Sequence, residues 1–208
     1  MFHVVTSYYR SDHIERQKEL DDCLLKNVEN PYIQSIHLLN DQIYPLEFLP
    51  DQRKIIQVVV EEDHKKRLGF DYAIRYINEN LANQRFILTN SDMYFDDTLN
   101  LIQDRHFTNT VFAVSRYDNG VLLHREDSQD SWMGIAPLRV DLSLCGFKFG
   151  IGGCDNRIAW VIHHAGYRLL NPSMTIRTHH LHQSNIRNYL GLPHVGGDYY
   201  FVSNSELS

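Results

Sequence analysis

The stretch RFILTNSDMYFDDTL, residues 85–99, joins an apolar run to a cluster of acidic side chains. Asp92 follows the run directly, and a carboxylate at a strand end suits a hard divalent cation such as Mg²⁺ or Mn²⁺. Such an ion could neutralise a diphosphate leaving group. Asn90 precedes Asp92 by two residues and shares its face in a strand. Asp96 and Asp97 are instead typical of the N-cap of a short helix, and a polar turn is the alternative for Asp92.

A second cluster is the histidine-rich segment IRTHHLH near the end of the chain. In an extended strand, His180 and His182 share a face, so both could approach one metal ion. Imidazole is a common ligand for transition metals. A hydrogen-bonded polar residue is the alternative for each histidine, and the cluster alone specifies neither the metal nor the reaction.

The glycine-rich segment FGIGGCDNRIAW precedes an apolar helical pattern. Gly152 and Gly153 allow a tight turn or a close approach of the backbone to a substrate. Asp155 then stands at the start of the helix, where it could be a helix cap. The functional alternative is a general base that removes the proton of a substrate hydroxyl during displacement at a sugar carbon.

Two further segments carry candidate binding residues. Asp130 and Trp132 lie in the polar segment LLHREDSQDSWMGIAPL, residues 122–138, which we expect to be a loop. There they offer a hydrogen-bond acceptor beside an aromatic surface for sugar rings, although Trp132 could instead anchor the loop in the core. In HKKRLGFD, Arg67 either solvates a helix start or neutralises a phosphate.

Composition predicts one globular domain over residues 1–208. Hydrophobic residues make up 43% of the chain, enough for one sizeable core. The net charge of −6 argues against a large electrostatic footprint on nucleic acid. Three widely spaced cysteines form no metal or redox pair, which favours free thiols in a reducing cytosol. No signal peptide or apolar span is apparent, so we expect a soluble cytoplasmic protein.

The elements that must position these residues alternate between strands and helices. Strands are predicted at 2–9, 34–41, 54–62, 85–92, 110–118 and 173–184, and helices at 12–30, 64–81 and within 146–172. Asp12 is the predicted N-cap of the first helix. This order predicts an α/β fold with a mostly parallel sheet flanked by helices, whose ligands gather beyond the carboxyl ends of the strands. The residues after Tyr189 are expected to form irregular cover or a mobile lid.

Taken in order, these features resemble the GT-A class of nucleotide-sugar-dependent glycosyltransferases. FILTNSD stands where that family carries its metal-binding DxD motif, GIGGCDN where many inverting members carry a Gly-Gly-acidic motif, and IRTHHLH where a late histidine completes the metal site. The resemblance spans about residues 2–184. It implies a GT-A, Rossmann-like fold with a short antiparallel C-terminal extension. It also implies a nucleotide-binding half over about 1–105, an acceptor and metal half over about 106–189, and a tail over 190–208.

Residue by residue, the resemblance implies that Asp92 and one or both of His180 and His182 bind Mn²⁺ or Mg²⁺, and that Asp155 is the base. Asn90 replaces the first acidic residue of the motif. Asp130, Trp132, Gly152 and Gly153 are the expected substrate-binding residues. The nucleotide is expected to contact Thr6, Ser7, Tyr8, Arg10, Glu61, Arg67, Asn90 and Ser91.

The predicted activity is metal-dependent transfer of a sugar, with inversion, from a UDP-sugar or GDP-sugar to an acceptor hydroxyl. A glycan is the default acceptor, and a protein or a modified DNA base are alternatives. The alternative functions are a nucleotidyltransferase, a metal-dependent hydrolase and a non-catalytic nucleotide-sugar or sugar-binding module. A nucleotidyltransferase usually needs a glycine-rich loop after its first strand, and TSYYRSDH contains no glycine.

Overall fold

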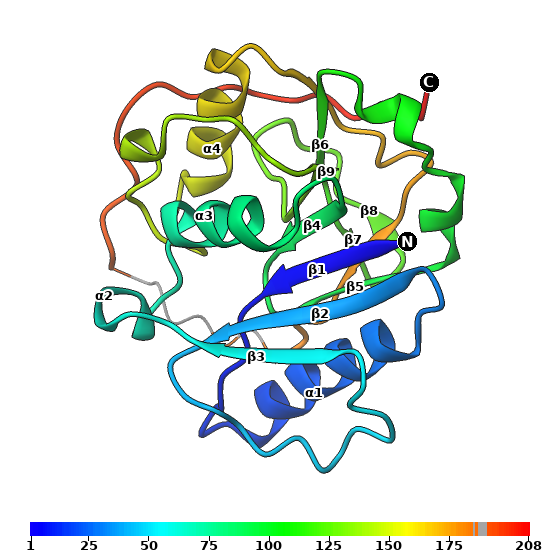
Figure 1. The fold of residues 1–208 in the computed structure, drawn as a ribbon, viewed down its shortest axis with the longest axis vertical. Helices are drawn as coiled ribbons and strands as arrows, with labels where there is room; N and C mark the ends of the chain where they lie inside the picture. Colours follow the sequence, from blue (N-terminus) through cyan, green and yellow to red (C-terminus); the bar gives the residue numbers. More distant parts are fainter. Residues whose placement is uncertain (185, 187–190) are drawn as a thin grey trace.

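The computed structural model describes residues 1–184, 186 and 191–208. Its main sheet has the strand order β10-β6-β9-β4-β1-β2-β3 (Figure 1). The strands are β1 (Phe2–Thr6), β2 (Ile33–Asn40), β3 (Ile55–Val59), β4 (Arg85–Thr89), β6 (Thr110–Val114), β9 (Ser131–Ile135) and β10 (Arg168–Leu170). Neighbours run parallel except at β9, which is antiparallel to both β4 and β6. The predicted mostly parallel α/β sheet is confirmed.

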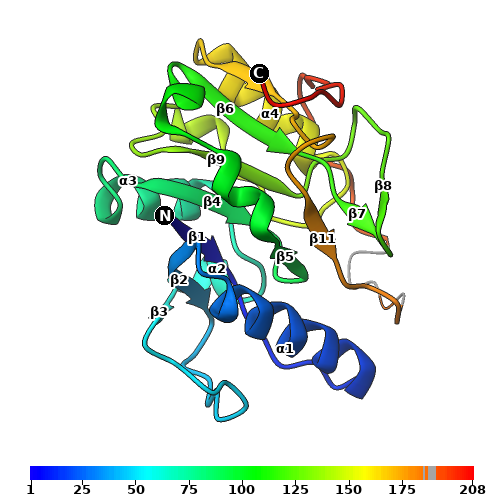
Figure 2. The same cartoon turned by 90° about the vertical axis from the view of Figure 1, so that its right-hand side faces the viewer.

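Helices cover both faces of this sheet (Figures 1 and 2). Helix α1 packs on one face, while α3 and α4 pack on the other. The α-helices are α1 (Ile14–Glu29), α2 (Glu62–Lys65), α3 (Phe70–Asn80) and α4 (Cys154–His164). Short 3₁₀ helices are η1 (Asp97–Leu101), η2 (Asp104–Phe107) and η3 (Leu142–Leu144).

The central strands contribute to two hydrophobic cores. Along β1, Val4 packs with the core under α1 and Val5 with the core under α3 and α4. Strand β4 alternates in the same way, with Ile87 on the first side and Phe86 and Leu88 on the second. Strands buried on both faces have near-continuous apolar sequences, which is why FHVV and FILT predict strands so clearly.

A second sheet brings the histidine segment to the end of β4. It has the order β5-β11-β7-β8, with β5 (Met93–Phe95), β7 (Tyr117–Asp118), β8 (Val121–Leu122) and β11 (Thr178–His180). Strand β11 is antiparallel to β5 and parallel to β7, so the extension predicted as antiparallel is a mixed sheet. His180 is paired with Met93, the residue after Asp92.

Three local predictions need correction. Helix α1 begins at Ile14 after His13, so Asp12 is not its cap. The predicted strand 173–184 shortens to the three residues of β11. The segment 122–138, predicted as a loop, contains β9, whose serine and glycine hide its strand character. Pairing with two neighbouring strands supplies the hydrogen bonds that stabilise β9 in spite of its weak local preference.

Trp132 lies in β9. The predicted role of its ring as a surface for sugar rings is wrong. Its side chain is only 1% exposed, and its ring meets Phe70 edge to face with 5.2 Å between centroids. The indole therefore packs in the core between the sheet and helix α3, the alternative interpretation of this residue.

The described part of the predicted tail, residues 191–208, is ordered cover over the second half of the chain. Its backbone bonds to Asn156 in α4, to Glu126 and to Asn171. Residue 190, with which the predicted tail begins, lies outside the described residues.

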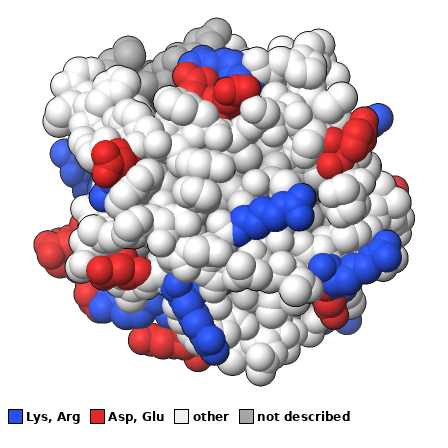
Figure 3. Space-filling model, turned by 90° about the horizontal axis from the view of Figure 1, so that it is seen from above, with Lys and Arg blue, Asp and Glu red and all other residues white. Residues whose placement is uncertain are grey.

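Charged side chains are interspersed on the face seen in Figure 3, among a larger area of uncharged residues. This distribution agrees with the mixed charge of the sequence. Cys23, Cys145 and Cys154 are buried free thiols, as predicted. Within the described residues, no helix has the length and apolar character needed to cross a membrane.

The core position of Trp132 predicts a large loss of stability on truncation. Trp132→Ala should lower the free energy of unfolding by about 3–5 kcal/mol, because the cavity left by the indole cannot fully close. Urea denaturation measures this change. Leu101→Ala, at a half-exposed side chain, is the control and should cost less than about 1 kcal/mol. A similarly small loss in Trp132→Ala would show that the ring is not part of the core.

Candidate active site

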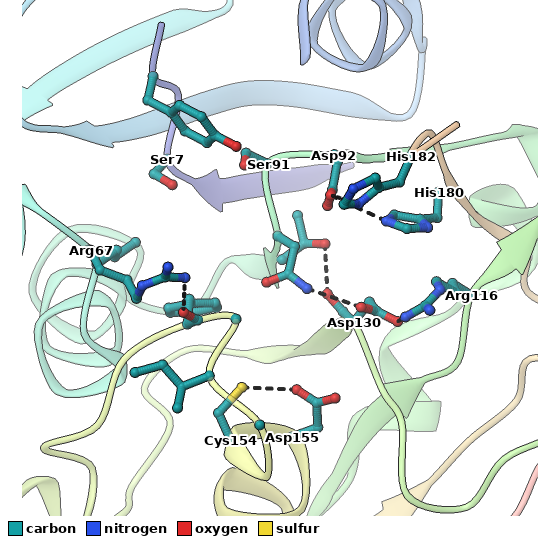
Figure 4. A pocket seen from close by; sticks show the side chains of 18 of the residues that line it. Ser7, Arg67, Ser91, Asp92, Arg116, Asp130, Cys154, Asp155, His180 and His182 are labelled. Atoms are coloured by element: carbon teal, nitrogen blue, oxygen red, sulfur yellow. Dashed lines mark hydrogen bonds and ion pairs between the residues drawn. The ribbon is translucent and has the colours of Figure 1, made fainter. Parts of the chain in front are cut away.

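A cleft of about 890 Å³ opens beyond the carboxyl ends of the parallel strands. It brings together most of the side chains predicted to carry chemistry, as Figure 4 shows for several of them. Those lining the cleft are Ser7, Tyr8, Arg10, Arg67, Asn90, Ser91, Asp92, Asp130, Gly152, Gly153, Asp155, His180 and His182. Thr6, Glu61 and Trp132 are not among its lining residues.

Asp92, His180 and His182 form the acidic and histidine cluster at one side of the cleft. Nε2 of His180 lies 3.2 Å from Oδ2 of Asp92, and Nδ1 of His182 lies 3.6 Å from the same oxygen. Burial alone would raise the pKa of Asp92, but hydrogen bonding to the two histidines holds it well below its usual range. The structure thus joins three residues that are far apart in the sequence.

The three side chains of this cluster could hold a divalent metal ion. Each of the three residues offers one ligand atom, and these three atoms all lie within 4.8 Å of one another. Two adjacent ligands bound at ~2.1 Å from one ion lie roughly 3.0–3.5 Å apart. The distances from Oδ2 of Asp92 to the two histidine nitrogens are close to this range. A carboxylate with two imidazoles suits Mn²⁺ and other first-row metals, so the residues fit the predicted ion and both histidines fit as ligands.

The outer nitrogens of both histidines have partners that orient the rings. Nδ1 of His180 is 2.7 Å from Oδ1 of Asp118. Nε2 of His182 is 2.9 Å from the carbonyl oxygen of Ile186. Carboxylates and carbonyls in this position fix the ring and its tautomer, which leaves the inner nitrogens directed at Asp92. Asp118 was not among the predicted site residues, and it is the last residue of the strand predicted at 110–118.

Arg16 is a second residue that the sequence analysis missed. Its guanidinium donates to Asp92 at 2.6 Å, to Glu19 at 3.0 Å and to the carbonyl of Leu181 at 3.3 Å. Arg16 is one helical turn before Leu20, on the apolar face of α1. A charged residue on the apolar face of the predicted helix was the one feature of the sequence that could have indicated a buried ion pair at Arg16.

Arg116 connects Asp130 to Asp118, the partner of His180. Its Nη1 donates to Asp130 at 2.9 Å and its Nε donates to Asp118 at 3.1 Å. Asp130 also accepts a hydrogen bond of 3.0 Å from the amide of Asn90. A continuous chain of polar contacts therefore runs from Asp130 through Arg116 and Asp118 to His180.

Asp155 lies on the opposite side of the cleft from Asp92 (Figure 4). Gly153, with φ of 83°, is the residue before α4, so Asp155 lies in the first helical turn and is not the N-cap. The thiol of Cys154 donates to Oδ1 of Asp155 at 3.1 Å. Burial, and then the negative charge of Asp130, raise the pKa of Asp155 to about 7. A carboxyl with this pKa is suited to proton transfer near neutral pH.

The residues predicted to bind the nucleotide divide into two groups. Ser7 and Ser91 face the cleft from the ends of β1 and β4 (Figure 4), and the backbone N–H of Tyr8 donates to Asn40 at 2.7 Å. Thr6, by contrast, is buried in β1, and Glu61 forms an exposed ion pair with Arg75.

Basic residues line the cleft beside this group. Lys65, Lys66 and Arg67 are consecutive, and Nη1 of Arg67 donates to the carbonyl of Phe149 at 3.0 Å. Cations at this position are suited to phosphate groups.

No protein-family model matches the sequence, and no curated protein does so. Among solved structures, the crystal structure of 2-C-methyl-D-erythritol 4-phosphate cytidylyltransferase from Francisella tularensis is similar, with a TM-score of 0.48 and 11% sequence identity. The match covers 90% of this chain and 93% of that chain.

The raised pKa of Asp155 predicts how stability depends on pH. Since the folded-state pKa of about 7 exceeds the ordinary value of 3.8, the folded protein retains a proton that the unfolded chain releases. This contribution to stability is complete below pH 3.8 and is lost as the pH rises through 7. Asp155→Asn removes the effect, so its melting temperature relative to wild type should be about 2 °C or more higher at pH 8.5 than at pH 5.

Thermal unfolding at the two pH values measures this difference. Asp12→Asn, at an exposed side chain outside the cleft lining, is the control and should show the same difference from wild type at both pH values. A pH-independent difference for Asp155→Asn as well would contradict the raised pKa.

Arg116 should affect the acidity of Asp155 from a distance. Its positive charge lowers the pKa of Asp155, opposing burial and Asp130. Arg116→Met should therefore raise that pKa by roughly half a unit or more, as expected for loss of a nearby charge in a partly buried site. Carboxyl ¹³C NMR titration measures it directly. Arg53→Met removes an exposed arginine that is paired with Asp51, and should leave the titration unchanged.

Proposed function

We propose that the protein transfers a sugar from a nucleoside diphosphate sugar to an acceptor hydroxyl, with inversion at the anomeric carbon. One observation carries the proposal: Asp155, with its pKa raised to about 7, shares a cleft with the Asp92, His180 and His182 cluster. Sugar transfer to a hydroxyl needs these two functions, a base for the acceptor and positive charge for the leaving group.

Asp92, His180 and His182 would hold the metal ion, with Asp118 orienting His180. Bound there, Mn²⁺ or Mg²⁺ would supply positive charge for the departing diphosphate. The cations at residues 65–67 offer further positive charge in the same cleft. Ser7, Tyr8 and Ser91, at the strand ends, would contact the nucleotide.

Asp155 would act on the acceptor. Its carboxylate takes the hydroxyl proton while the hydroxyl oxygen forms a bond to the anomeric carbon. The bond from that carbon to the diphosphate oxygen breaks, and its electron pair leaves with the nucleoside diphosphate. Because the attack comes from the face opposite the leaving group, a single displacement inverts the configuration. The base is effective above its pKa, so the rate should rise with pH through about 7.

Nucleotidyl transfer is the second candidate function. The run of Lys65, Lys66 and Arg67 at the cleft favours it, since consecutive cations suit a triphosphate. In that reaction an acceptor oxygen attacks the α-phosphorus and pyrophosphate leaves. A phosphate acceptor is already ionised at neutral pH and needs no base, so this reaction leaves the raised pKa of Asp155 without a role. We therefore favour sugar transfer.

Product analysis separates the two reactions. The protein is incubated with UDP-sugars and GDP-sugars, Mn²⁺ and a set of oligosaccharides, and in parallel with nucleoside triphosphates and sugar phosphates. Sugar transfer yields nucleoside diphosphate and an extended glycan of inverted configuration. Pyrophosphate release from the triphosphates would favour nucleotidyl transfer, and nucleotide binding without either product would favour a binding module.

Asp155→Asn should reduce the transfer rate by roughly 100-fold or more, the contribution typical of a general base. Nucleotide binding, measured by thermal shift, should stay within about threefold of wild type because Asp155 lies across the cleft from the strand-end residues. Asp12→Asn is the matched control. Wild-type transfer in Asp155→Asn would remove Asp155 from the role of base, and a retained anomeric configuration would exclude single displacement.

A further inference from the structure

Two aromatic side chains of the C-terminal segment face the cleft near Asp155. Tyr199 and Phe201 both line the cleft and are 37% and 54% exposed. Between and after them, the side chains turn away from the cleft: Tyr200 is half-buried and stacks on His163 of α4 with 4.0 Å between ring centroids, and Val202 is 5% exposed. This alternation is that of an extended segment with one face toward the cleft.

The backbone of this segment is held firmly in place. The N–H of Tyr200 donates to the carbonyl of Asn156 at 3.1 Å, and the N–H of Val202 donates to the carbonyl of Glu126 at 3.0 Å. The side-chain amide of Asn171 donates to the carbonyl of Val202 at 3.1 Å. The position of the two exposed rings therefore follows from the fold and not from a free chain end.

The glycine pair allows this segment to approach helix α4. A Cβ on Gly153 would lie 2.5 Å from the hydroxyl oxygen of Tyr199, and one on Gly152 would lie 2.8 Å from Nε2 of His194. A Cβ at either position would therefore displace the side chain that faces it, and the φ of 83° at Gly153 also disfavours larger residues. The two glycines thus place Tyr199 beside the first turn of α4, which also carries Asp155.

We propose that Tyr199 and Phe201 form the acceptor platform, on which the apolar face of a carbohydrate ring packs so that one of its hydroxyls reaches Asp155. This inference rests on the proposed sugar transfer and names its acceptor class. Aromatic rings with apolar faces suit the C–H face of a sugar, and the polar residues Asp127 and Ser128, also at the cleft, suit its hydroxyls. These two rings take the role predicted for Trp132, whose own ring is in the core.

Saturation-transfer NMR tests the platform without requiring activity. The probes are methyl glycosides of glucose, galactose, mannose and N-acetylglucosamine, and a serine-containing peptide that has hydroxyls but no sugar ring. We expect saturation of at least one glycoside by wild-type protein, its loss in Phe201→Ala and Tyr199→Ala, and its retention in Phe201→Trp. Leu101→Ala, which also removes an exposed apolar side chain but lies outside the cleft lining, should behave as wild type.

Saturation of the peptide alone, or of glycosides equally in all variants, would overturn the carbohydrate platform. Binding of UDP and GDP with Mn²⁺ is measured by thermal shift in the same samples. If the nucleotides bind and no glycoside does, the platform fails while donor binding stands; if neither binds, the proposed function fails with it.

Kinetics give a second measurement once a donor is found. Phe201→Ala should raise the KM for the acceptor by roughly tenfold, the factor that corresponds to ~1.4 kcal/mol of lost contact. The KM for the donor and the slow hydrolysis of the donor by water should not change, because Phe201 would contact the acceptor alone. An equal rise in both KM values would place the ring in the donor site and overturn the assignment.

Discussion

Buried carboxylates at the carboxyl edge of the sheet require positive charge beside them, and this requirement organises the cleft. Asp92 is 8% exposed and Asp130 is 5% exposed. A carboxylate removed from water is stable only with hydrogen bonds or a counter-charge. Arg16 reaches Asp92 from helix α1, and Arg116 reaches Asp130 from the turn after β6. The positions of α1 and of the segment after β6 are thus coupled to the chemistry of the site, because removing either arginine takes a positive charge away from a buried carboxylate.

The same requirement is compatible with the proposed metal ion at Asp92, although an arginine already contacts this residue. Arg16 has two further acceptors, Glu19 at 3.0 Å and the carbonyl of Leu181 at 3.3 Å. A carboxylate offers two oxygens with several acceptor sites, so a cation and a guanidinium can share it or divide it between them. If a cation takes the place of the arginine at Asp92, the guanidinium keeps two partners and is not left buried without any. The contacts around Asp92 are therefore compatible with neutralisation of its charge by Arg16 or by a metal ion.

Sequence patterns predicted the parallel strands well, since strands β1 and β4 are apolar on both faces and stand out from their surroundings. They also led to the cluster of Asp92, His180 and His182, because Asp92 follows a strand and the histidines are close together in the sequence. They failed where long-range pairing decides the structure. The strand that contains Trp132 is specified by its two neighbours, and Arg116 has no local pattern that distinguishes it from a surface arginine. The sequence shows which side chains are present, but the topology decides which of them meet.

Asn90, where the resemblance to glycosyltransferases is weakest, has a physical explanation in this topology. Strand β9 runs antiparallel beside β4, so the residue before β9, Asp130, stands next to the residue after β4, which is Asn90. The amide of Asn90 donates to Asp130 at 3.0 Å. A carboxylate at position 90 would place two negative charges at that distance in a partly buried site, which raises the pKa of one of them or separates the pair. An amide at position 90 instead donates a hydrogen bond to Asp130, which Arg116 also contacts, and Asp92 with the two histidines would then provide the proposed metal ligands.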